Sequence, residues 1–349
     1  MAPSPRPTPT PLPTPTPLPT PTPVPPCVTE VPLRVALGQL LLTLAAPDQF
    51  TMLDELVGTG SVSGVVILGS PTEDDLDRLP RTDAAGVPVL LTSDEEGGRV
   101  QRLAPLLGPL PPAAQLAETA PASVESTFAA YGEGLRNLGI SVAFAPVVDV
   151  GGGPGIGNRS FSDDPAVVAT YAGAVVDGYL AAGVLPVLKH FPGHGRASAD
   201  SHLGFATTPP IEELRSSDLL PFEELAGEQV GVMVGHLLVP GLTEDLPASL
   251  SPAAVDGLLR DELGFDGLVV SDDLGMNAIA DRWDNAEAAQ LAVSAGVDLV
   301  ILQGPEQVVP VLDHLEAAVV ARTLNRGQVD DSLERVLALK NVDPCDLRG

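Results

Sequence analysis

Two residues with complementary chemistry, Asp200 and His202, stand one residue apart in the segment KHFPGHGRASADSH, residues 189–202. In an extended loop, side chains two positions apart leave the backbone on the same side, so the Asp200 carboxylate can accept a hydrogen bond from the His202 ring. That bond would orient the imidazole, stabilise its protonated form and leave the second ring nitrogen free as a general acid or base. A loop stabilised by this hydrogen bond alone, without catalysis, is the structural alternative.

A second chemically suggestive pair, Asp272 and Asp273, ends the apolar run in LVVSDDLGM, residues 268–276. A carboxylate at the end of a buried strand can act as a nucleophile, as a metal ligand or as the cap of the following helix. We expect Asp273 to cap the next helix, and Asp272 to point into a pocket as a nucleophile.

Cationic side chains form a third group, in which Arg102, Arg159 and Lys189 would converge with Asp94. Together they would offer charge-assisted hydrogen bonds to a hydroxyl-rich or anionic ligand. For any one of them, a salt bridge at the surface is the alternative. Aromatic residues make up 3% of the chain, which is too few for long stacking platforms, so a single sugar held by hydrogen bonds is the expected ligand.

Metal binding is a separate possibility because four of the five histidines follow predicted strands, namely His190, His194, His202 and His236. The spacing of His190 and His194 would suit two ligands on a helix, but Pro192 and Gly193 between them prevent a helix. Neither cysteines nor a Glu-rich set complete a site. We therefore predict no metal and no cofactor, and expect these histidines to make structural or substrate contacts.

The elements that would position these residues are short apolar runs alternating with amphipathic stretches of helical length. The predicted strands are residues 65–68, 88–92, 142–148, 184–188, 231–239, 267–270 and 298–302. The predicted helices include residues 124–138, 165–182, 211–226, 252–263 and 286–295. This alternation predicts parallel strands with helices outside, and a (β/α)8 barrel fits the length from Cys27 to Gly349. A doubly wound open sheet is less favoured because no Gly-rich phosphate loop follows the first strand.

Polar residues and glycines collect after the predicted strands. In a (β/α)8 barrel the carboxyl ends of the strands form the active face. One rim would therefore hold Asp94, Arg102, Asp149, Arg159, Lys189, His190, Asp200, His202, His236 and Asp272.

Composition excludes several classes of partner. The chain has 349 residues, 44% of them hydrophobic, which is enough for a sizeable core. Its 46 acidic and 18 basic residues give a net charge of -28, and no basic cluster is present, so nucleic acid is a poor partner. The longest apolar stretches, such as residues 40–46, are too short to span a bilayer, so no membrane insertion is expected.

The two ends of the chain have features of their own. Residues 1–26 form a Pro/Thr-rich low-complexity tail or linker, in which alternate prolines favour polyproline II, and residues 27–349 form the predicted barrel domain. Cys27 and Cys345 bracket the barrel, which suggests a disulfide in an oxidising compartment, with two free thiols as the alternative. Tail and cysteines favour an extracellular or cell-surface location with wall association. No signal peptide is visible, which favours the cytoplasm.

Six segments in this order resemble glycoside hydrolase family 3, and specifically its single-domain β-N-acetylhexosaminidase branch. They are DEEGGRVQRL, APVVDV, GNRSF, KHFPGHG, DSH and SDDLGM, and the similarity extends from residue 38 to residue 340. The resemblance implies a TIM-like barrel, with Asp272 as nucleophile, His202 as acid/base and Asp200 as its partner. It implies further that N-acetylglucosamine is bound by Asp94, Arg102, Arg159, Lys189 and His190. Glu95 departs from the pattern, because many relatives have Gln there, and it is expected to add charge beside the pocket.

The function implied is a retaining β-N-acetylglucosaminidase that removes terminal N-acetylglucosamine from cell-wall or chitin-derived glycosides and acts as a monomer. A histidine acid/base carries less negative charge than a carboxylate, so phosphate could replace water, and a phosphorylase is one alternative. A β-glucosidase of the family's two-domain type is a second, disfavoured by chain length. A non-catalytic wall-binding module is a third, disfavoured because every expected catalytic position is filled.

Overall fold

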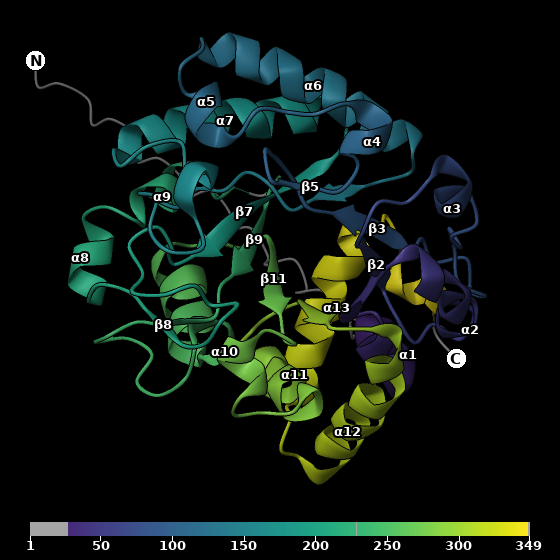
Figure 1. Ribbon diagram of the computed structural model, residues 1–349. Helices are drawn as coiled ribbons and strands as arrows, with labels where there is room; N and C mark the ends of the chain where they lie inside the picture. The colour runs from purple at the N-terminus through teal and green to yellow at the C-terminus, as the bar shows by residue number, and fades with distance from the viewer. Residues whose placement is uncertain (1–26, 228, 348–349) are drawn as a thin grey trace, which may run out of the picture.

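Eight parallel strands close into a barrel in the computed structural model, which describes residues 27–227 and 229–347 (Figure 1). In order around the barrel they are β1 (Leu41–Ala45), β12 (Leu299–Leu302), β11 (Leu268–Asp273), β9 (Gly231–Val234), β7 (Leu185–Phe191), β6 (Val142–Ala143), β3 (Leu90–Ser93) and β2 (Gly64–Ile67). Each strand pairs in parallel with both neighbours. The predicted (β/α)8 barrel is confirmed, and the open doubly wound sheet was the wrong alternative.

The strands form because their side chains are apolar and buried on both faces. Every residue of β1, β2 and β12 is buried. Alternate side chains enter different layers: Leu42 and Leu44 belong to a cluster to which all eight strands contribute, whereas Leu41 packs with the outer helices. The barrel interior is therefore a packed core, and open space is left at its ends.

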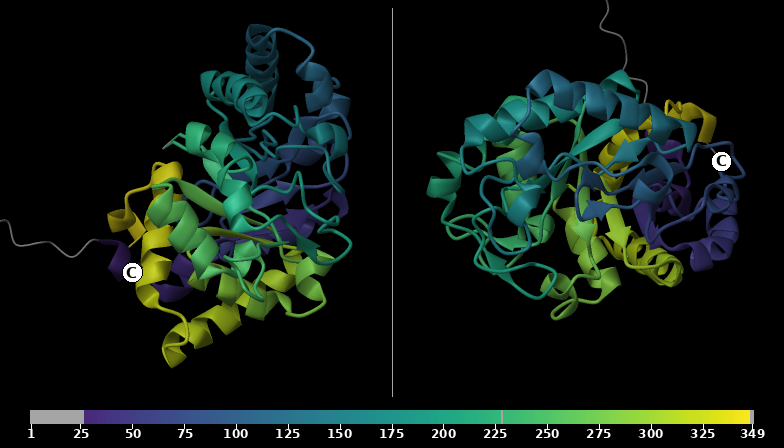
Figure 2. Two further views of the ribbon diagram at one scale, coloured as in Figure 1. Left: turned by 90° about the vertical axis from the view of Figure 1, so that its left-hand side faces the viewer. Right: turned by 45° about the horizontal axis from the view of Figure 1, so that its top comes forward.

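Helices cover the outside of the barrel (Figures 1 and 2). The longer ones are α6 (Pro121–Asn137), α7 (Pro165–Ala181), the π-helix Ala253–Glu262, α11 (Asn285–Ser294), α12 (Val308–Ala321) and α13 (Arg326–Leu339). The shorter ones are α1 (Leu33–Gly38), α2 (Leu53–Gly58), α3 (Glu73–Asp77), α4 (Ala104–Leu107), α5 (Ala113–Leu116), α8 (Ile211–Arg215), α9 (Leu220–Leu225) and α10 (Asn277–Ala280).

Three element predictions were wrong in detail. The strand predicted over 142–148 is regular only over Val142–Ala143, although irregular pairing with β7 continues beyond it: Pro146 accepts the N–H of Lys189, and Val148 donates to the Lys189 carbonyl. The helix predicted over 211–226 is two helices, α8 and α9; Pro221 lies in the first turn of α9, where a proline is tolerated, whereas inside one continuous helix it would remove a hydrogen bond. The strand predicted over 231–239 is divided into β9 and β10 (Leu237–Leu238), and β10 pairs with β8 (Ala206–Thr207) outside the barrel. The first barrel strand, β1, was not among the predicted strands.

The ends of the barrel domain are joined covalently. Cys27 and Cys345 form a disulfide with their Cα atoms 4.9 Å apart, so that the predicted pairing is confirmed. The predicted Pro/Thr tail, residues 1–26, lies outside the described residues. Within the part of the chain that the structure describes, no helix has the length and apolarity needed to cross a membrane.

Candidate active site

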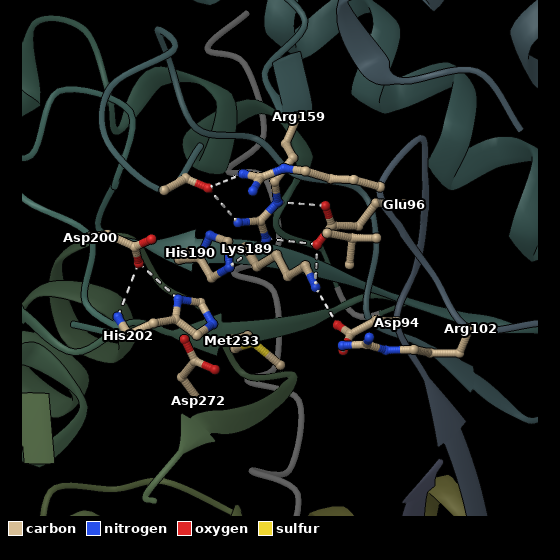
Figure 3. Close-up of a pocket in the computed structure, with 13 residues that line it drawn as sticks. Asp94, Glu96, Arg102, Arg159, Lys189, His190, Asp200, His202, Met233 and Asp272 are labelled. Carbon is tan, nitrogen blue, oxygen red and sulfur yellow. Dashed lines mark hydrogen bonds and ion pairs between the residues drawn. The ribbon is translucent and has the colours of Figure 1, made fainter. Parts of the chain in front are cut away.

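A cavity of about 240 Å³ opens at the carboxyl ends of the strands, where the sequence predicted the active rim. All eight residues predicted for catalysis or sugar binding line it, namely Asp94, Arg102, Arg159, Lys189, His190, Asp200, His202 and Asp272 (Figure 3). Five further residues line it that the sequence analysis did not select, namely Glu96, Arg99, Val100, Gly155 and Met233. The barrel thus brings together side chains that lie up to 178 positions apart (94 to 272).

The predicted Asp200–His202 pair forms, although residues 201–203 are a turn and not the extended loop that the prediction assumed. Oδ1 of Asp200 lies 2.8 Å from Nδ1 of His202 and also accepts a hydrogen bond from the His202 backbone N–H at 3.0 Å. Burial alone would raise the pKa of Asp200, but these hydrogen bonds outweigh it and lower the pKa, so that the carboxylate is ionised. An ionised carboxylate only accepts hydrogen bonds, so Nδ1 carries the proton and Nε2 is left free for chemistry.

Asp272 lies at the end of β11, beside the His202 ring (Figure 3). Its Oδ1 accepts the backbone N–H of Asp273 at 2.9 Å. Burial alone would raise the pKa of Asp272, but the neighbouring imidazoles of His236 and His190 and this N–H outweigh it and lower the pKa. The geometry therefore supplies an ionised carboxylate across from a free imidazole nitrogen.

Asp273 does not cap a helix, so that prediction was wrong. Its Oδ1 accepts the N–H of Gly275 at 2.8 Å and closes a turn, whereas α10 begins after Met276. Burial raises the pKa of Asp273 to about 6, and the charge of Asp272 adds to the effect. The two adjacent carboxyl groups therefore differ in acidity. At Asp272 the imidazoles and the N–H outweigh burial, whereas at Asp273 burial and the charge of Asp272 outweigh the hydrogen bond from Gly275.

A buried network of charges forms the opposite wall of the cavity. Nζ of Lys189 lies 2.6 Å from Asp94 and 2.7 Å from Glu96. Arg159 forms a two-pronged pair with Glu96, with N to O distances of 2.7 and 2.8 Å, and Arg102 lies 3.4 Å from Asp94. Burial alone would raise the pKa of both carboxylates, but the cations lower it, to about 2 for Asp94. Three cations against two anions leave this wall with one net positive charge.

His190 has a defined protonation state in this wall. Its Nε2 lies 3.3 Å from a nitrogen of Arg159, which can only donate, so Nε2 accepts. The proton is therefore on Nδ1, which lies 2.7 Å from Asp149. Asp149 is fully buried beneath the cavity and does not line it, so its predicted place on the rim was wrong.

The charge that the sequence analysis expected from Glu95 beside the pocket comes from Glu96 instead. Glu95 does not reach the pocket: its fully buried carboxyl accepts hydrogen bonds from Ser93, Tyr131 and the N–H of Leu103. Glu96 lines the cavity instead. The sequence could have predicted this position of Glu96. Asp94 and Glu96 are two positions apart at the end of a strand, so their side chains leave the backbone on the same side.

His236 is the other predicted rim residue that the structure places elsewhere. It is fully buried, with Nδ1 at 2.7 Å from Ser249 and Nε2 at 2.8 Å from the carbonyl of Asp273. Among the described residues, no group of three or more His, Cys, Asp or Glu side chains is arranged to hold a metal ion.

The chain is similar to known proteins over most of its length. Residues 33–339 match the family described as "Glycosyl hydrolase family 3 N terminal domain". The chain belongs to glycosyl hydrolase family 3. It is 48% identical over 297 residues to the beta-hexosaminidase LpqI of Mycobacterium tuberculosis, a match that covers 80% of this chain and 76% of LpqI.

Solved structures of family 3 proteins share the fold. A glycosyl hydrolase of the family from Mycobacterium smegmatis is 43% identical, with a TM-score of 0.82 over 89% of this chain and 98% of that one. A family 3 β-N-acetylglucosaminidase from a Paenibacillus species is 34% identical, with a TM-score of 0.82 over 89% of this chain and 62% of that one. The resemblance predicted from the sequence is confirmed.

The six family 3 segments meet at this one cavity. Five of them contribute residues that line it, and the sixth, APVVDV, contributes Asp149, which holds His190 from below. The segments of the family therefore describe one site in space, although they are spread over most of the chain.

Proposed function

We propose that this protein is a retaining β-N-acetylglucosaminidase, a β-N-acetylhexosaminidase that removes terminal N-acetylglucosamine from glycosides. The carrying observation is that Asp272 and the Asp200–His202 pair line the same small cavity. The relatives support the activity, because those at 40–48% identity are named beta-hexosaminidases. These names favour hydrolysis over the phosphorylase and β-glucosidase alternatives.

Sugar binding is proposed for the charged wall of the cavity. Ionised Asp94 would accept hydrogen bonds from sugar hydroxyls, while Arg102, Arg159 and Lys189 would donate to hydroxyl or acetamido oxygens. His190 would contact the sugar through its ring, because the single lone pair of its Nε2 is already occupied by Arg159. Because these cations are already paired with carboxylates, the wall is ordered before the sugar arrives, which reduces the entropic cost of binding.

In the proposed first step, a carboxylate oxygen of Asp272 attacks the anomeric carbon. Protonated Nε2 of His202 gives its proton to the glycosidic oxygen as the bond between that oxygen and the anomeric carbon breaks. Asp200 stabilises the imidazolium before the transfer. The products of this step are the free alcohol of the aglycone and a glycosyl ester on Asp272.

In the proposed second step, neutral His202 accepts a proton from water at the same Nε2. The water oxygen bonds to the anomeric carbon, the ester bond to Asp272 breaks, and the carboxylate is regenerated. Two inversions at one carbon retain the β configuration. His202 is protonated again and is ready for the next substrate.

The proposed activity is tested by comparing aryl β-N-acetylglucosaminide with aryl β-glucoside as substrates. We expect turnover of the first and little of the second. Asp272→Ala should abolish turnover while the thermal unfolding midpoint stays close to that of the wild type, because the variant lacks the covalent step. An active Asp272→Ala variant would refute the nucleophile.

The acid/base role is tested with His202→Ala on substrates that differ in their leaving group. An activated aryl glycoside needs little acid assistance and should still form the glycosyl ester, whereas a disaccharide should fail. Azide, which needs no base, should partly restore turnover of the activated substrate. Equal loss on both substrates, without rescue, would place the acid/base elsewhere.

Wall association and a monomeric state stay predictions from the sequence. Light scattering after size exclusion would test the second, and hydrolysis of wall fragments compared with chitin oligosaccharides would identify the natural substrate.

A further inference from the structure

Ser201, between the two residues of the proposed acid/base pair, behaves differently from both. The side chains of His202 and Asp200 are 60% and 27% exposed, whereas Ser201 is 2% exposed. Residues 201–203 form a turn, closed by a hydrogen bond from the Leu203 N–H to the Asp200 carbonyl at 3.0 Å, and in this turn Ser201 faces the protein. Ser201 is therefore the point at which this loop is attached to the barrel.

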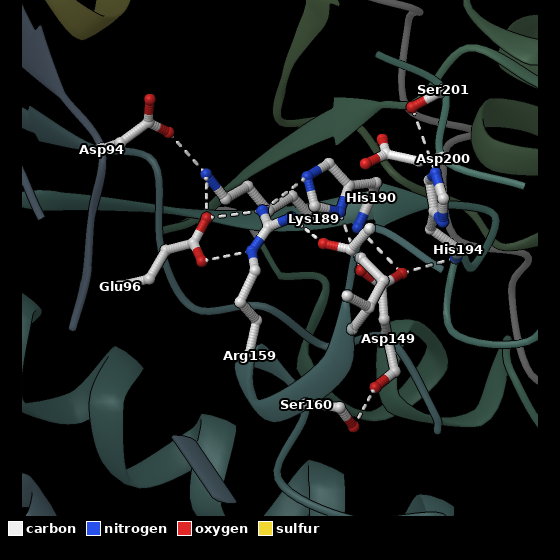
Figure 4. A network of polar contacts seen from close by, with 12 residues as sticks. Asp94, Glu96, Asp149, Arg159, Ser160, Lys189, His190, His194, Asp200 and Ser201 are labelled. Atoms are coloured by element: carbon white, nitrogen blue, oxygen red, sulfur yellow. Dashed lines mark hydrogen bonds and ion pairs between the residues drawn. The ribbon is translucent and has the colours of Figure 1, made fainter. Parts of the chain in front are cut away.

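Two hydrogen bonds make that attachment. Oγ of Ser201 lies 3.1 Å from Nε2 of His194, as Figure 4 shows. The carbonyl of Ser201 accepts the backbone N–H of Ala278, just inside α10, at 3.4 Å. The side-chain bond is the shorter of the two, and it connects the loop to the inside of the site.

His194 is itself held in place from below. Its backbone N–H donates to Oδ1 of Asp149 at 2.6 Å, and its side chain is buried. Within the described part of the chain, Nδ1 of this ring is buried without a hydrogen-bond partner. The contact with Ser201 is therefore the one hydrogen bond that the His194 side chain makes there, and it fixes the orientation of the ring.

Asp149 connects this arrangement to the sugar-binding wall. Its Oδ2 lies 2.7 Å from Nδ1 of His190, while its Oδ1 accepts from the backbone of His194. One fully buried carboxylate thus holds both a cavity-lining imidazole and the residue to which the acid/base loop is attached (Figure 4).

We propose that the Ser201–His194 hydrogen bond positions His202 for proton transfer, and that Asp149 sets this position relative to the bound sugar. Ser201 and His194 are positioning residues, since neither lines the cavity. The proposal rests on the proposed role of His202 as the acid/base. It adds that this hydrogen bond holds the exposed His202 ring close enough to the glycosidic oxygen for proton transfer.

The test is Ser201→Ala, with kcat/KM measured on a disaccharide and on an activated aryl β-N-acetylglucosaminide. The parameter kcat/KM reports formation of the glycosyl ester, in which only the disaccharide depends strongly on acid assistance. Loss of one positioning hydrogen bond should lower kcat/KM about tenfold for the disaccharide and less than about twofold for the aryl substrate.

Ser198→Ala is the matched control, because Ser198 lies in the same loop and its Oγ accepts a backbone hydrogen bond from Thr207 at 3.0 Å. It removes the same hydroxyl from the loop without touching His194. We expect it to change kcat/KM less than about twofold on both substrates.

A double-mutant cycle tests the pairing itself. His194→Phe keeps an aromatic ring but removes Nε2, so it should show the same preference for the activated substrate. Adding Ser201→Ala to it should produce no further loss, whereas additive losses would show that the two residues act independently.

The two proposals fail differently. If His202→Ala discriminates between leaving groups but Ser201→Ala does not, the positioning proposal is overturned and the acid/base stands. If His202→Ala lowers kcat/KM equally for both substrates, the proposed function is overturned instead.

Discussion

The chain contains two lysines, and they lie at opposite ends of the barrel. Lys189, near the carboxyl end of β7, contacts the carboxylates of Asp94 and Glu96. Lys340 follows α13 at the amino ends of the strands, and its Nζ lies 2.6 Å from the side-chain oxygen of Gln39 and 2.9 Å from the carbonyl of Ser63. Both side chains are buried, at 2% and 6% exposure.

Their partners give the two amines opposite acidities. Burial alone lowers the pKa of either lysine. At Lys189 the charges of Asp94 and Glu96 outweigh burial and raise the pKa, so the ammonium persists. At Lys340 neutral oxygens do not offset burial, which lowers the pKa to about 7. At the active-site end of the barrel, therefore, neighbouring carboxylates stabilise the buried ammonium of Lys189. At the other end no carboxylate contacts Lys340 in this way, and burial favours its neutral amine.

The pKa values of the carboxyl groups near Lys189 also depend on whether an opposite charge offsets burial. Asp94 and Glu96 contact the lysine and have lowered pKa values, whereas Glu95 between them points away from it. Burial raises the pKa of Glu95 to about 7, despite its hydrogen bonds from Ser93 and Tyr131. Of three consecutive acids, the two that contact the ammonium have a lowered pKa and the one that points away has a raised pKa.

The largest expected effect comes from removing the lysine of the site. Lys189→Met leaves Asp94 and Glu96 as buried carboxylates without their shared ammonium, which should lower kcat/KM by about 10³-fold or more. Lys340→Met is the matched control and should stay within about twofold of the wild type. Similar losses in both variants, measured on the aryl β-N-acetylglucosaminide, would contradict the contrast between the two ends.

Lys340 should make stability rise with pH above neutrality. Between pH 7 and 10.5 the unfolded chain carries a proton on this amine that the folded chain has lost, so unfolding becomes less favourable as pH increases. The full effect is about 5 kcal/mol, and Lys340→Met should remove this pH dependence from urea unfolding curves.

Nuclear magnetic resonance gives a direct measurement, because lysine labelling produces one side-chain signal for each of the two lysines. The Lys340 signal should titrate near pH 7 and the Lys189 signal should remain that of an ammonium. Two signals that titrate together near the ordinary lysine value would refute the assignment.

Glu95 should act in the opposite direction and over the lower pH window. Its folded pKa of about 7 lies above the ordinary glutamate value of 4.5, so the folded chain binds an extra proton between these two values and loses stability as pH rises through them. Glu95→Gln should therefore be the more stable protein above pH 7, by about 3 kcal/mol at most, with little difference near pH 4.5. Unfolding curves of equal separation at both pH values would contradict the buried, protonated carboxyl.

The smallest expected effect concerns Asp83, whose charge raises the pKa of Lys340 slightly against the effect of burial. Asp83→Asn should lower the Lys340 midpoint in the same titration by about half a pH unit or less. Asp83 also accepts the N–H groups of Ala85 and Val87 through Oδ1, which the asparagine oxygen retains. A rise in the midpoint would show that this charge does not reach the amine.

Much of the fold was predictable because alternation of buried strands and helices is a local property. The run 64–67 and the run 299–302 are apolar throughout and were predicted within one residue of their bounds. Strand ends were less predictable where pairing becomes irregular after Ala143 and where the strand divides at His236, since pairing there depends on the neighbouring strand. β1 was not predicted because its apolar run had no distinguishing flanking signal.

The site was predictable where spacing within one loop decides the contact. Asp200 and His202 are two positions apart, and their hydrogen bond follows from that spacing. Glu96 and Glu95 were not distinguished, because which of two adjacent acids meets Lys189 depends on β7, about ninety residues further along the chain. His236 and Asp149 follow strands like the true lining residues, but the barrel interior buries them.

The sequence by itself determined the class of fold, the family and the set of groups that could carry the chemistry, and it suggested the pairing of Cys27 with Cys345. These depend on residue types and short spacings, which are local. Only the tertiary structure decided which groups are charged and which face the cavity. It gave Lys189 two carboxylates and Lys340 none, because protonation depends on burial and on charges brought within a few ångströms by strands far apart in the chain.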